Sequence, residues 1–179
     1  MNFEPTRIPG AFVVHPERHA DERGFFARTW CADELEAQGL VARLAQASVS
    51  WNRRRGTLRG MHWQAAPHEE VKLVACVRGA IWDVIADLRA DSPAFRQWLG
   101  VRLDAENLDM LYVPPGVAHG FLTLADDTLV HYQISERHQP DHARGVRWDD
   151  PALGIAWPEP PVVVSERDRA LPLLGGAIR

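Results

Sequence analysis

Residues 71–88 read VKLVACVRGAIWDVIADL, and this stretch decides the fold class of the chain. Val71–Val77 and Ala80–Leu88 both place apolar residues at every second position, which is typical of β-strands. Arg78-Gly79 between them predicts a tight turn. The faces expected to be apolar carry Val71, Leu73, Ala75 and Val77 in the first strand and Trp82, Val84, Ala86 and Leu88 in the second.

Short strand patterns continue on both sides of this stretch. Further strands are expected at Ala11–Val14, Gly56–Gln64, Trp98–Leu103, Leu111–Val113, Gly120–Leu124 and Thr128–Ser135. Cys31–Gln38 predicts a helix, because acids occupy its first turns and Gly39 supplies a left-handed end. Val162–Ser165 is expected to be a strand or an extended arm, and Asp168–Leu174 a short helix. Many short strands with closely spaced turns predict an all-β sandwich or barrel, a fold that can hold a ligand inside.

The composition is that of one compact domain. The chain has 179 residues, 46% of them hydrophobic and 25% charged, and its Gly and Pro residues are scattered rather than gathered into a linker. We therefore expect a single domain over residues 1–179. A formal net charge of -4 argues against a general nucleic-acid binder, although a local arginine cluster can still bind a small anion.

Signals of export and of membrane insertion are missing from the sequence. Cys31 and Cys76 are too few for a disulfide framework and form no CxxC pair, so we expect two reduced thiols. The opening residues, MNFEPTRIPG, hold an acid and two prolines where a signal peptide needs an apolar run. No segment approaches roughly 18 consecutive apolar residues, so we expect no membrane span and a cytoplasmic location.

Polar residues inside otherwise apolar strands are the candidates for chemistry. Tyr132 falls on the apolar face of its strand, where a core tyrosine with a satisfied hydroxyl would also lie. His62 lies in the segment LRGMHWQ, and Lys72 interrupts the apolar strand that follows. A buried lysine is costly unless it is paired or used. His119 follows the segment PPGVA, which resembles the second cupin motif, where Pro and Gly turn the chain and the His enters the barrel.

A bound metal is the first function that these histidines suggest. Metal-binding cupins carry a His-x-His pair, a Glu and a further His, a ligand set that suits a divalent transition metal. Here Gln64 stands at the second position of the pair, and Lys72 lies near the position of the Glu. A cation beside the site repels a metal ion, and His62 and His119 alone are too few ligands. We therefore expect no metal.

Arginines form the second group of candidates. Arg53–Arg55 precedes Gly56, and Arg23 and Arg59 lie in glycine-containing segments. Such runs commonly cover a solvated surface, but guanidinium groups also suit bidentate contacts with phosphate. A basic cluster in an acidic protein therefore fits a substrate that carries a diphosphate.

Six segments together resemble the dTDP-4-dehydrorhamnose 3,5-epimerase family, and they follow the family's order across nearly the whole chain. They are DERGFF at 21–26, GTLRGMHWQ at 56–64, KLV at 72–74, VPPGVAHGF at 113–121, RWDDP at 147–151 and SERD at 165–168. The resemblance implies a cupin-type jelly roll with a few short helices, a homodimer and an isomerase. It also implies a nucleotide-diphosphate 4-keto-6-deoxyhexose as substrate, epimerised at C3 and C5 with no metal and no redox cofactor.

The same resemblance implies roles for individual residues. The catalytic set is His62 as base, Tyr132 as acid, Asp168 as the carboxylate that orients the base, and Lys72 beside the keto oxygen. The substrate-binding set is Arg23, Arg59, His119, Gln46, Ser48 and Arg167. A C4 ketone acidifies the protons on C3 and C5, so a base on one face and a donor on the other can invert a centre. Strict alternation places Arg59 and His62 on opposite faces, unless a bulge turns one inward or Arg59 serves a partner subunit.

Departures from the family pattern fall at nucleotide-binding positions. Arg28 stands where the family usually has Glu, Arg137 and His138 lie where aromatic residues pack on the base, and Ala143 replaces a base-contacting Glu. We expect dTDP as the nucleotide, with another nucleotide or the epimerisation of a single carbon as alternatives. A metal-dependent cupin enzyme and a non-catalytic sugar-binding cupin are more distant alternatives, which metal analysis and deuterium exchange would separate.

Overall fold

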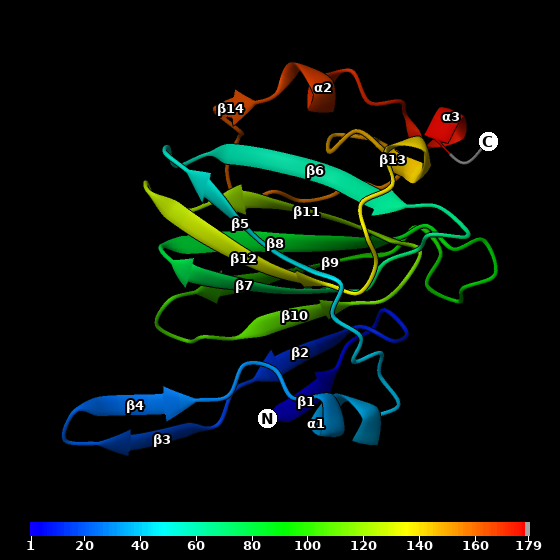
Figure 1. The fold of residues 1–179 in the computed structure, drawn as a ribbon. Coiled ribbons are helices and arrows are strands. Elements are labelled where there is room, and N and C mark those ends of the chain that lie inside the picture. Colours follow the sequence, from blue (N-terminus) through cyan, green and yellow to red (C-terminus); the bar gives the residue numbers. More distant parts are fainter. Residues whose placement is uncertain (178–179) are drawn as a thin grey trace.

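The computed structural model describes residues 1–177, and two mainly antiparallel sheets that pack face to face form its body (Figure 1). The first sheet has the strand order β1-β2-β10-β7-β12-β5. Its strands are β1 Asn2–Pro5, β2 Phe12–His15, β10 Met110–Val113, β7 Lys72–Arg78, β12 Thr128–Ile134 and β5 Gln46–Asn52.

The second sheet has the order β13-β6-β11-β8-β9, and β14 pairs with the outer side of β6. Its strands are β13 Ala143–Gly145, β6 Thr57–Gln64, β11 Val117–Thr123, β8 Ala80–Asp87, β9 Trp98–Asp104 and β14 Val163–Val164. Together the sheets form the cupin-type jelly roll that the sequence predicts.

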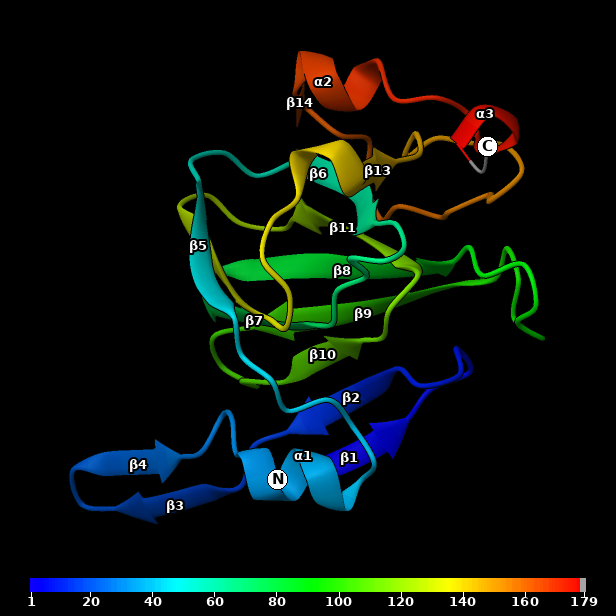
Figure 2. The same ribbon diagram turned by 45° about the vertical axis from the view of Figure 1, so that its right-hand side comes forward.

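The remaining elements are short. They are α1 Ala32–Ala37, a 3-10 helix at Pro140–His142, α2 Glu166–Arg169, α3 Leu174–Ala177, and the hairpin strands β3 Arg18–Asp21 and β4 Gly24–Ala27. The hairpin pairs only with itself and projects from the body of the molecule (Figures 1 and 2). Within residues 1–177, no helix is long and apolar enough to cross a membrane.

The predicted helices lie near their expected positions. α1 falls within the predicted helix, and Gly39 after it has a φ of +70°, as a left-handed helix end requires. The C-terminal prediction over Asp168–Leu174 is displaced. α2 begins earlier because the Ser165 hydroxyl accepts the backbone N–H of Asp168 and caps the helix, and it ends before Pro172.

Apolar side chains between the sheets form the main core. This core contains Val74 and Cys76 from β7, Ile81 and Ile85 from β8, Leu103, Leu111, Val113, Val117, Phe121 and Val130. The C-terminal segment covers the outer face of the second sheet, as Figure 1 shows, with Leu153 and Leu174 buried beneath it. Leu35 of α1 packs on the outer face of the first sheet. The molecule therefore buries both faces of its central strands.

The expected faces are confirmed for β8 and corrected for β7. Trp82, Val84 and Ala86 all pack in the outer cluster, as alternation predicts. In β7 only part of the expected apolar face is buried. Leu73 is buried near α1, whereas Val77, at the far end of the strand, is 46% exposed. The cover from α1 is too short to reach Val77.

Candidate active site

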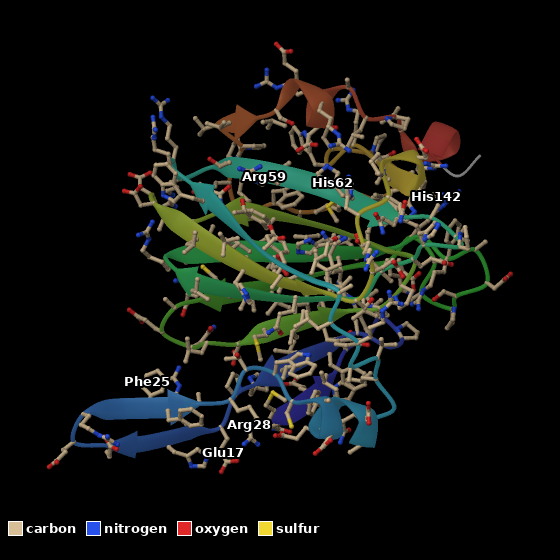
Figure 3. The ribbon with its side chains drawn as sticks, viewed as in Figure 1. Glu17, Phe25, Arg28, Arg59, His62 and His142 are labelled. Atoms are coloured by element: carbon tan, nitrogen blue, oxygen red, sulfur yellow. The ribbon has the colours of Figure 1, made fainter. Side chains whose placement is uncertain are left out.

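An irregularity in β6 decides which of its side chains face the space between the sheets. In the pairing of β6 with β11, His62 lies opposite His119 and Arg59 lies opposite Phe121. β6 therefore has one residue more than β11 between these pairs, which is a β-bulge. The bulge breaks strict alternation, and Arg59 and His62 line the same pocket (Figure 3).

Glycines make this bulge possible. Gly60 has a φ of +124°, and a Cβ atom there would lie 2.5 Å from the Cα of Gly120 on β11. A Cβ atom on Gly120 would lie 2.7 Å from the carbonyl oxygen of Arg59. Both distances are shorter than any real contact, so the two strands approach this closely only with glycine at both positions.

The pocket lies between the two sheets and has a volume of about 350 Å³. Most of the residues predicted for catalysis and binding line it, although they come from distant parts of the sequence. They are His62, Tyr132, Asp168, Lys72, Arg59, His119 and Arg167, joined by Ser50, Phe121, Ile134 and Ser165.

His62 is hydrogen-bonded to Asp168 across 2.7 Å, from Nε2 to Oδ1. The His62 side chain is 37% exposed, whereas the Asp168 side chain is 5% exposed. Burial alone would raise the pKa of Asp168, but hydrogen bonds from His62 and from the Gly60 amide outweigh burial, so this pKa lies below its ordinary value. The ionised carboxylate fixes the orientation of the His62 ring.

Tyr132 reaches the same pocket from β12, on the opposite sheet. Its ring meets that of His119 edge-on, with centroids 6.1 Å apart. Burial and the nearby Asp83 raise the pKa of Tyr132 far above its ordinary value, against weaker effects of Arg59 and a hydrogen bond with Ser50. The phenol therefore keeps its proton at neutral pH.

The contacts of Lys72 explain how this lysine can lie inside an apolar strand. Its side chain is 10% exposed, and its Nζ lies 2.5 Å from Oε1 of Glu70. Nζ also donates to the carbonyl oxygen of His62 across 3.4 Å. Sequence reasoning missed Glu70, although two acids at 69–70 directly before the strand were a signal.

A second histidine–carboxylate pair, His119 and Asp83, lies deeper in the pocket wall. The distance from Nε2 of His119 to Oδ1 of Asp83 is 2.7 Å, and the side chains are 5% and 0% exposed. Asp83 was also missed in the sequence. Its signal was a lone acid in the apolar run of β8, comparable to the lysine in β7.

An adjoining pocket of about 230 Å³ shares His62, Lys72, Ile134 and Arg167 with the first. Its other lining residues are Gln46, Trp63, Gln64, Glu70, His138, Ala143 and Arg144. Gln46 was predicted to bind substrate, and Arg144 was not predicted. Cationic side chains line both of these adjoining pockets, which together are called the groove below.

Two predicted substrate-binding residues lie away from this groove in their own chain. Arg23 is at the turn of the β3–β4 hairpin, where its side chain is 84% exposed and paired with Asp21. Figure 3 shows Phe25 of the same hairpin well away from Arg59 and His62. Ser48 is exposed on β5 and lines neither pocket. Substrate binding by these two residues stays a prediction, because the hairpin points outward and Ser48 lies on an open edge strand.

The residues of the cupin metal pattern are already used for other contacts. His62 and His119 both direct Nε2 at a carboxylate. The Gln64 amide donates to the carbonyl oxygen of His68 and accepts the backbone N–H of Gln139, which holds a loop. Among residues 1–177, no group of three or more His, Cys, Asp or Glu side chains is placed to hold a metal ion. The side chains present do not fit a resident metal.

A model of the dTDP-4-dehydrorhamnose 3,5-epimerase family matches residues 5–175. The chain belongs to this family. A relative of that name from Methanothermobacter thermautotrophicus is 41% identical over 172 residues, which cover 94% of this chain and 92% of the relative. The epimerase family also includes a dTDP-4-dehydrorhamnose 3-epimerase from Streptomyces niveus, 39% identical over 178 residues that cover 99% of this chain and 86% of the relative.

Solved structures of this epimerase family have the same fold. The crystal structure of dTDP-4-dehydrorhamnose 3,5-epimerase from Bacillus anthracis, with TDP and PPi bound, matches with a TM-score of 0.93. Its sequence is 42% identical, and the match covers 96% of this chain and 98% of that chain. This chain is therefore an isomerase of the carbohydrate epimerase class, as the resemblance in its sequence implies.

Proposed function

We propose that this epimerase inverts C3 and C5 of a dTDP-linked 4-keto-6-deoxyhexose and so converts dTDP-4-dehydro-6-deoxyglucose to dTDP-4-dehydrorhamnose. The observation that carries the proposal is the placement of His62 and Tyr132 on opposite sheets around one pocket. A proton acceptor and a proton donor that face each other across a sugar are what inversion of a carbon centre requires.

The reaction begins at a C–H bond beside the C4 ketone. His62 takes the proton, and Asp168 supports the imidazolium that forms. The electron pair of the C–H bond forms a double bond to C4, and the π pair of the ketone moves to O4, where the ammonium group of Lys72 stabilises the enolate. Tyr132 then gives its proton to the same carbon from the opposite face while the ketone re-forms. Solvent returns a proton to the phenolate and removes one from the imidazolium.

The cationic groove supports a diphosphate substrate. Arg59 and Arg167 line the catalytic pocket, and Arg144 lines the adjoining one. Guanidinium groups bind phosphate oxygens in bidentate geometry. The structure of the Bacillus anthracis relative holds TDP, which supports a thymidine nucleotide here as well. His138 and Ala143 in the adjoining pocket distinguish this chain from the usual family pattern at the base.

Solvent deuterium exchange tests this function. The protein is incubated in D₂O with dTDP-linked and, separately, CDP-linked 4-keto-6-deoxyhexose, and the products are analysed by mass and stereochemistry. We expect deuterium at both C3 and C5 of the dTDP sugar, with inversion at both. Absence of exchange with every 4-keto nucleotide sugar would contradict the proposal and favour a non-catalytic sugar-binding protein.

Epimerisation of one carbon is the second candidate. The named activity of the Streptomyces niveus relative, a 3-epimerase at 39% identity, supports it. The same experiment separates the two, because a 3-epimerase gives inversion at C3 alone.

We also propose a homodimer in which the β3–β4 hairpin of one protomer packs on the other. Phe25 and Phe26 of the hairpin are 51% and 66% exposed, which is costly for large apolar side chains on an isolated arm. A partner that covers them would also place Arg23 beside the partner's pocket. The predicted role of Arg23 in substrate binding then agrees with its distance from the pocket of its own chain.

Mixed dimers test this arrangement. A His62→Ala chain and an Arg23→Ala chain are inactive or weak alone. In a mixed dimer, the pocket of the second chain keeps His62 and receives an intact Arg23 from the first, so we expect activity to return. A His62→Ala chain mixed with a Lys72→Ala chain is the matched control, because both residues serve their own pocket. Lack of recovery in the first mixture, or monomers in sedimentation, would contradict the proposal.

A further inference from the structure

The pair formed by Asp83 and His119 is not used in the mechanism above, yet it lies in the wall of the catalytic pocket. Asp83 lies on β8 and His119 on the neighbouring β11, with both side chains on the face that points between the sheets. Oδ1 of Asp83 meets Nε2 of His119 at 2.7 Å. Nδ1 of His119 is therefore the ring nitrogen left for the pocket.

The second oxygen of Asp83 has no hydrogen-bond partner among the residues that the structure describes. Oδ2 is fully buried and makes no hydrogen bond. An ionised carboxylate with one bare oxygen in such a place is costly, because water has been removed and only one hydrogen bond replaces it. Burial raises the pKa of Asp83, and the charges of His119 and Lys72 only partly offset this. The pair therefore tends to keep a proton that a solvent-exposed pair would lose.

That extra proton decides what His119 presents to the substrate. Without it, Asp83 is ionised, Nε2 carries the only ring hydrogen, and Nδ1 is an acceptor. With it, the proton is shared between Asp83 and Nε2, and Nδ1 carries a hydrogen in either arrangement. We propose that Asp83 is a positioning residue that keeps His119 a hydrogen-bond donor to a substrate oxygen in the pocket.

The substrate oxygen that accepts this hydrogen bond is O4, on which the enolate charge develops. This assignment rests on the proposed function. Lys72 and His119 both line this pocket. An N–H group that is already in place when negative charge develops stabilises it without reorganisation. His119 and Lys72 thus both donate hydrogen bonds to O4, and the buried Asp83 compensates their positive charges.

Other titratable groups surround this region from every neighbouring element. They are Arg59 and His62 from β6, Lys72 from β7, Tyr132 from β12, and Asp168 and Arg167 from α2. Lys72 is paired with Glu70, and His62 with Asp168. The change Asp83→Asn removes the carboxylate that shares the proton with His119 and leaves these other pairs in place.

The first test is nitrogen NMR of the histidine rings in the wild-type protein and in Asp83→Asn. We expect Nδ1 of His119 to carry a hydrogen at neutral pH in the wild type. The midpoint at which this ring loses its proton should fall by about one pH unit or more in Asp83→Asn. An unprotonated Nδ1 in the wild type at neutral pH, or an unchanged midpoint, would overturn the proposal. This result needs no substrate, so it stands apart from success or failure of the proposed function.

The second test is kinetic and uses Asp87→Asn as the matched control. Asp87 is fully buried on the same strand, but it binds Arg89 and Ser92 away from the pocket. We expect Asp83→Asn to lower kcat about 10-fold to 100-fold with little change in KM. The alkaline limb of kcat/KM should move to lower pH, and exchange at C3 and C5 should slow in parallel. Equal effects of the two variants, with unchanged pH profiles, would show a merely structural role.

Discussion

Two histidines line one pocket from the adjacent strands β6 and β11, and each is hydrogen-bonded to an aspartate. The two pairs differ in burial and in the number of groups that contact the carboxylate. His62 and Asp168 lie at the open side, with the histidine partly exposed and the carboxylate held by several donors. His119 and Asp83 lie in the buried wall, with one carboxylate oxygen unpartnered. The His62–Asp168 and His119–Asp83 distances are both 2.7 Å, so only their surroundings distinguish them.

The difference shows how surroundings can assign opposite tasks to the same residue types. The surrounding donors lower the pKa of Asp168, so its carboxylate stays charged and holds the His62 ring in place. Burial raises the pKa of Asp83, so its pair retains a proton and the ring offers a hydrogen. One pair is suited to remove a proton from carbon and the other to stabilise the charge left behind.

The largest expected effect is that of His62→Ala. Removing the base should lower exchange at both C3 and C5 by roughly 10²–10⁴-fold, measured as deuterium incorporation. Thermal unfolding should show an intact fold. His131→Ala is the matched control, because His131 lies on the outer face of β12 opposite Val49 and lines neither pocket. Exchange that continues at the wild-type rate would exclude His62 as the base.

Asp168→Asn tests whether the carboxylate assists the base. The amide keeps the size of the side chain but loses the charge that favours the imidazolium. We expect kcat to fall about 10²-fold, less than with loss of the histidine itself, with exchange at both carbons reduced together. The measurement is the initial rate of exchange at neutral pH. A rate equal to that of the wild type would mean that Asp168 only holds α2 over β6.

Tyr132→Phe separates removal of the proton from its return. The base remains, so deuterium exchange should continue, while inversion falls roughly 10²-fold because protonation of the opposite face is lost. Product stereochemistry beside deuterium content measures both. Formation of inverted product at the wild-type rate would count against Tyr132 as the acid.

The smallest expected effect is on stability. The contributions of two buried aspartates of β8, Asp87 and Asp83, should depend on pH in opposite directions. Hydrogen bonds from Arg89 and Ser92 overcome burial and lower the pKa of Asp87, so its stabilisation is present above the unfolded value of 3.8 and is lost as pH falls. The pKa of Asp83 is raised, so its contribution is present below 3.8 and is lost as pH rises.

Denaturant unfolding from roughly pH 3 to pH 7 measures these contributions as free energies of unfolding. The cost of Asp87→Asn should grow with pH toward about 1–3 kcal/mol, while that of Asp83→Asn should shrink. If the free-energy costs of Asp83→Asn and Asp87→Asn changed with pH in the same direction, the proposed contrast between Asp83 and Asp87 would be contradicted.

The sequence predicted the parts of the fold in which alternation is clear. β8 and β12 have regular apolar faces, and both the strands and Tyr132 on its inward face were expected. β5 was missed, because QASVSWN places serines toward the pocket side and exposes Val49 and Trp51 on the other. The β3–β4 hairpin was missed because its strands pair with no other strand among residues 1–177 and carry no apolar period.

In the candidate site, too, some residues were predicted from the sequence and others were missed. His62, Lys72 and Asp168 were predicted through family motifs, and the structure places all of them in one pocket. Asp83 was missed because its pair with His119 joins two strands and depends on register, which one sequence does not reveal. Glu70 was missed although it lies only two positions before its partner Lys72. Alternation alone could not place Arg59 beside His62 either, since the bulge that does so depends on the close approach of β6 and β11.

The hydrogen bond between His62 and Asp168 joins residues separated by 106 positions in the chain. Because synthesis proceeds from the N-terminus, His62 and both sheets leave the ribosome before the segment that carries Asp168. A nascent chain can therefore form its core while the carboxylate that completes the base is still absent. The contact between His62 and Asp168, which we propose to be catalytic, is then among the last to form. On that proposal, a product cut short after β13 would keep most of the strands but lack the activity.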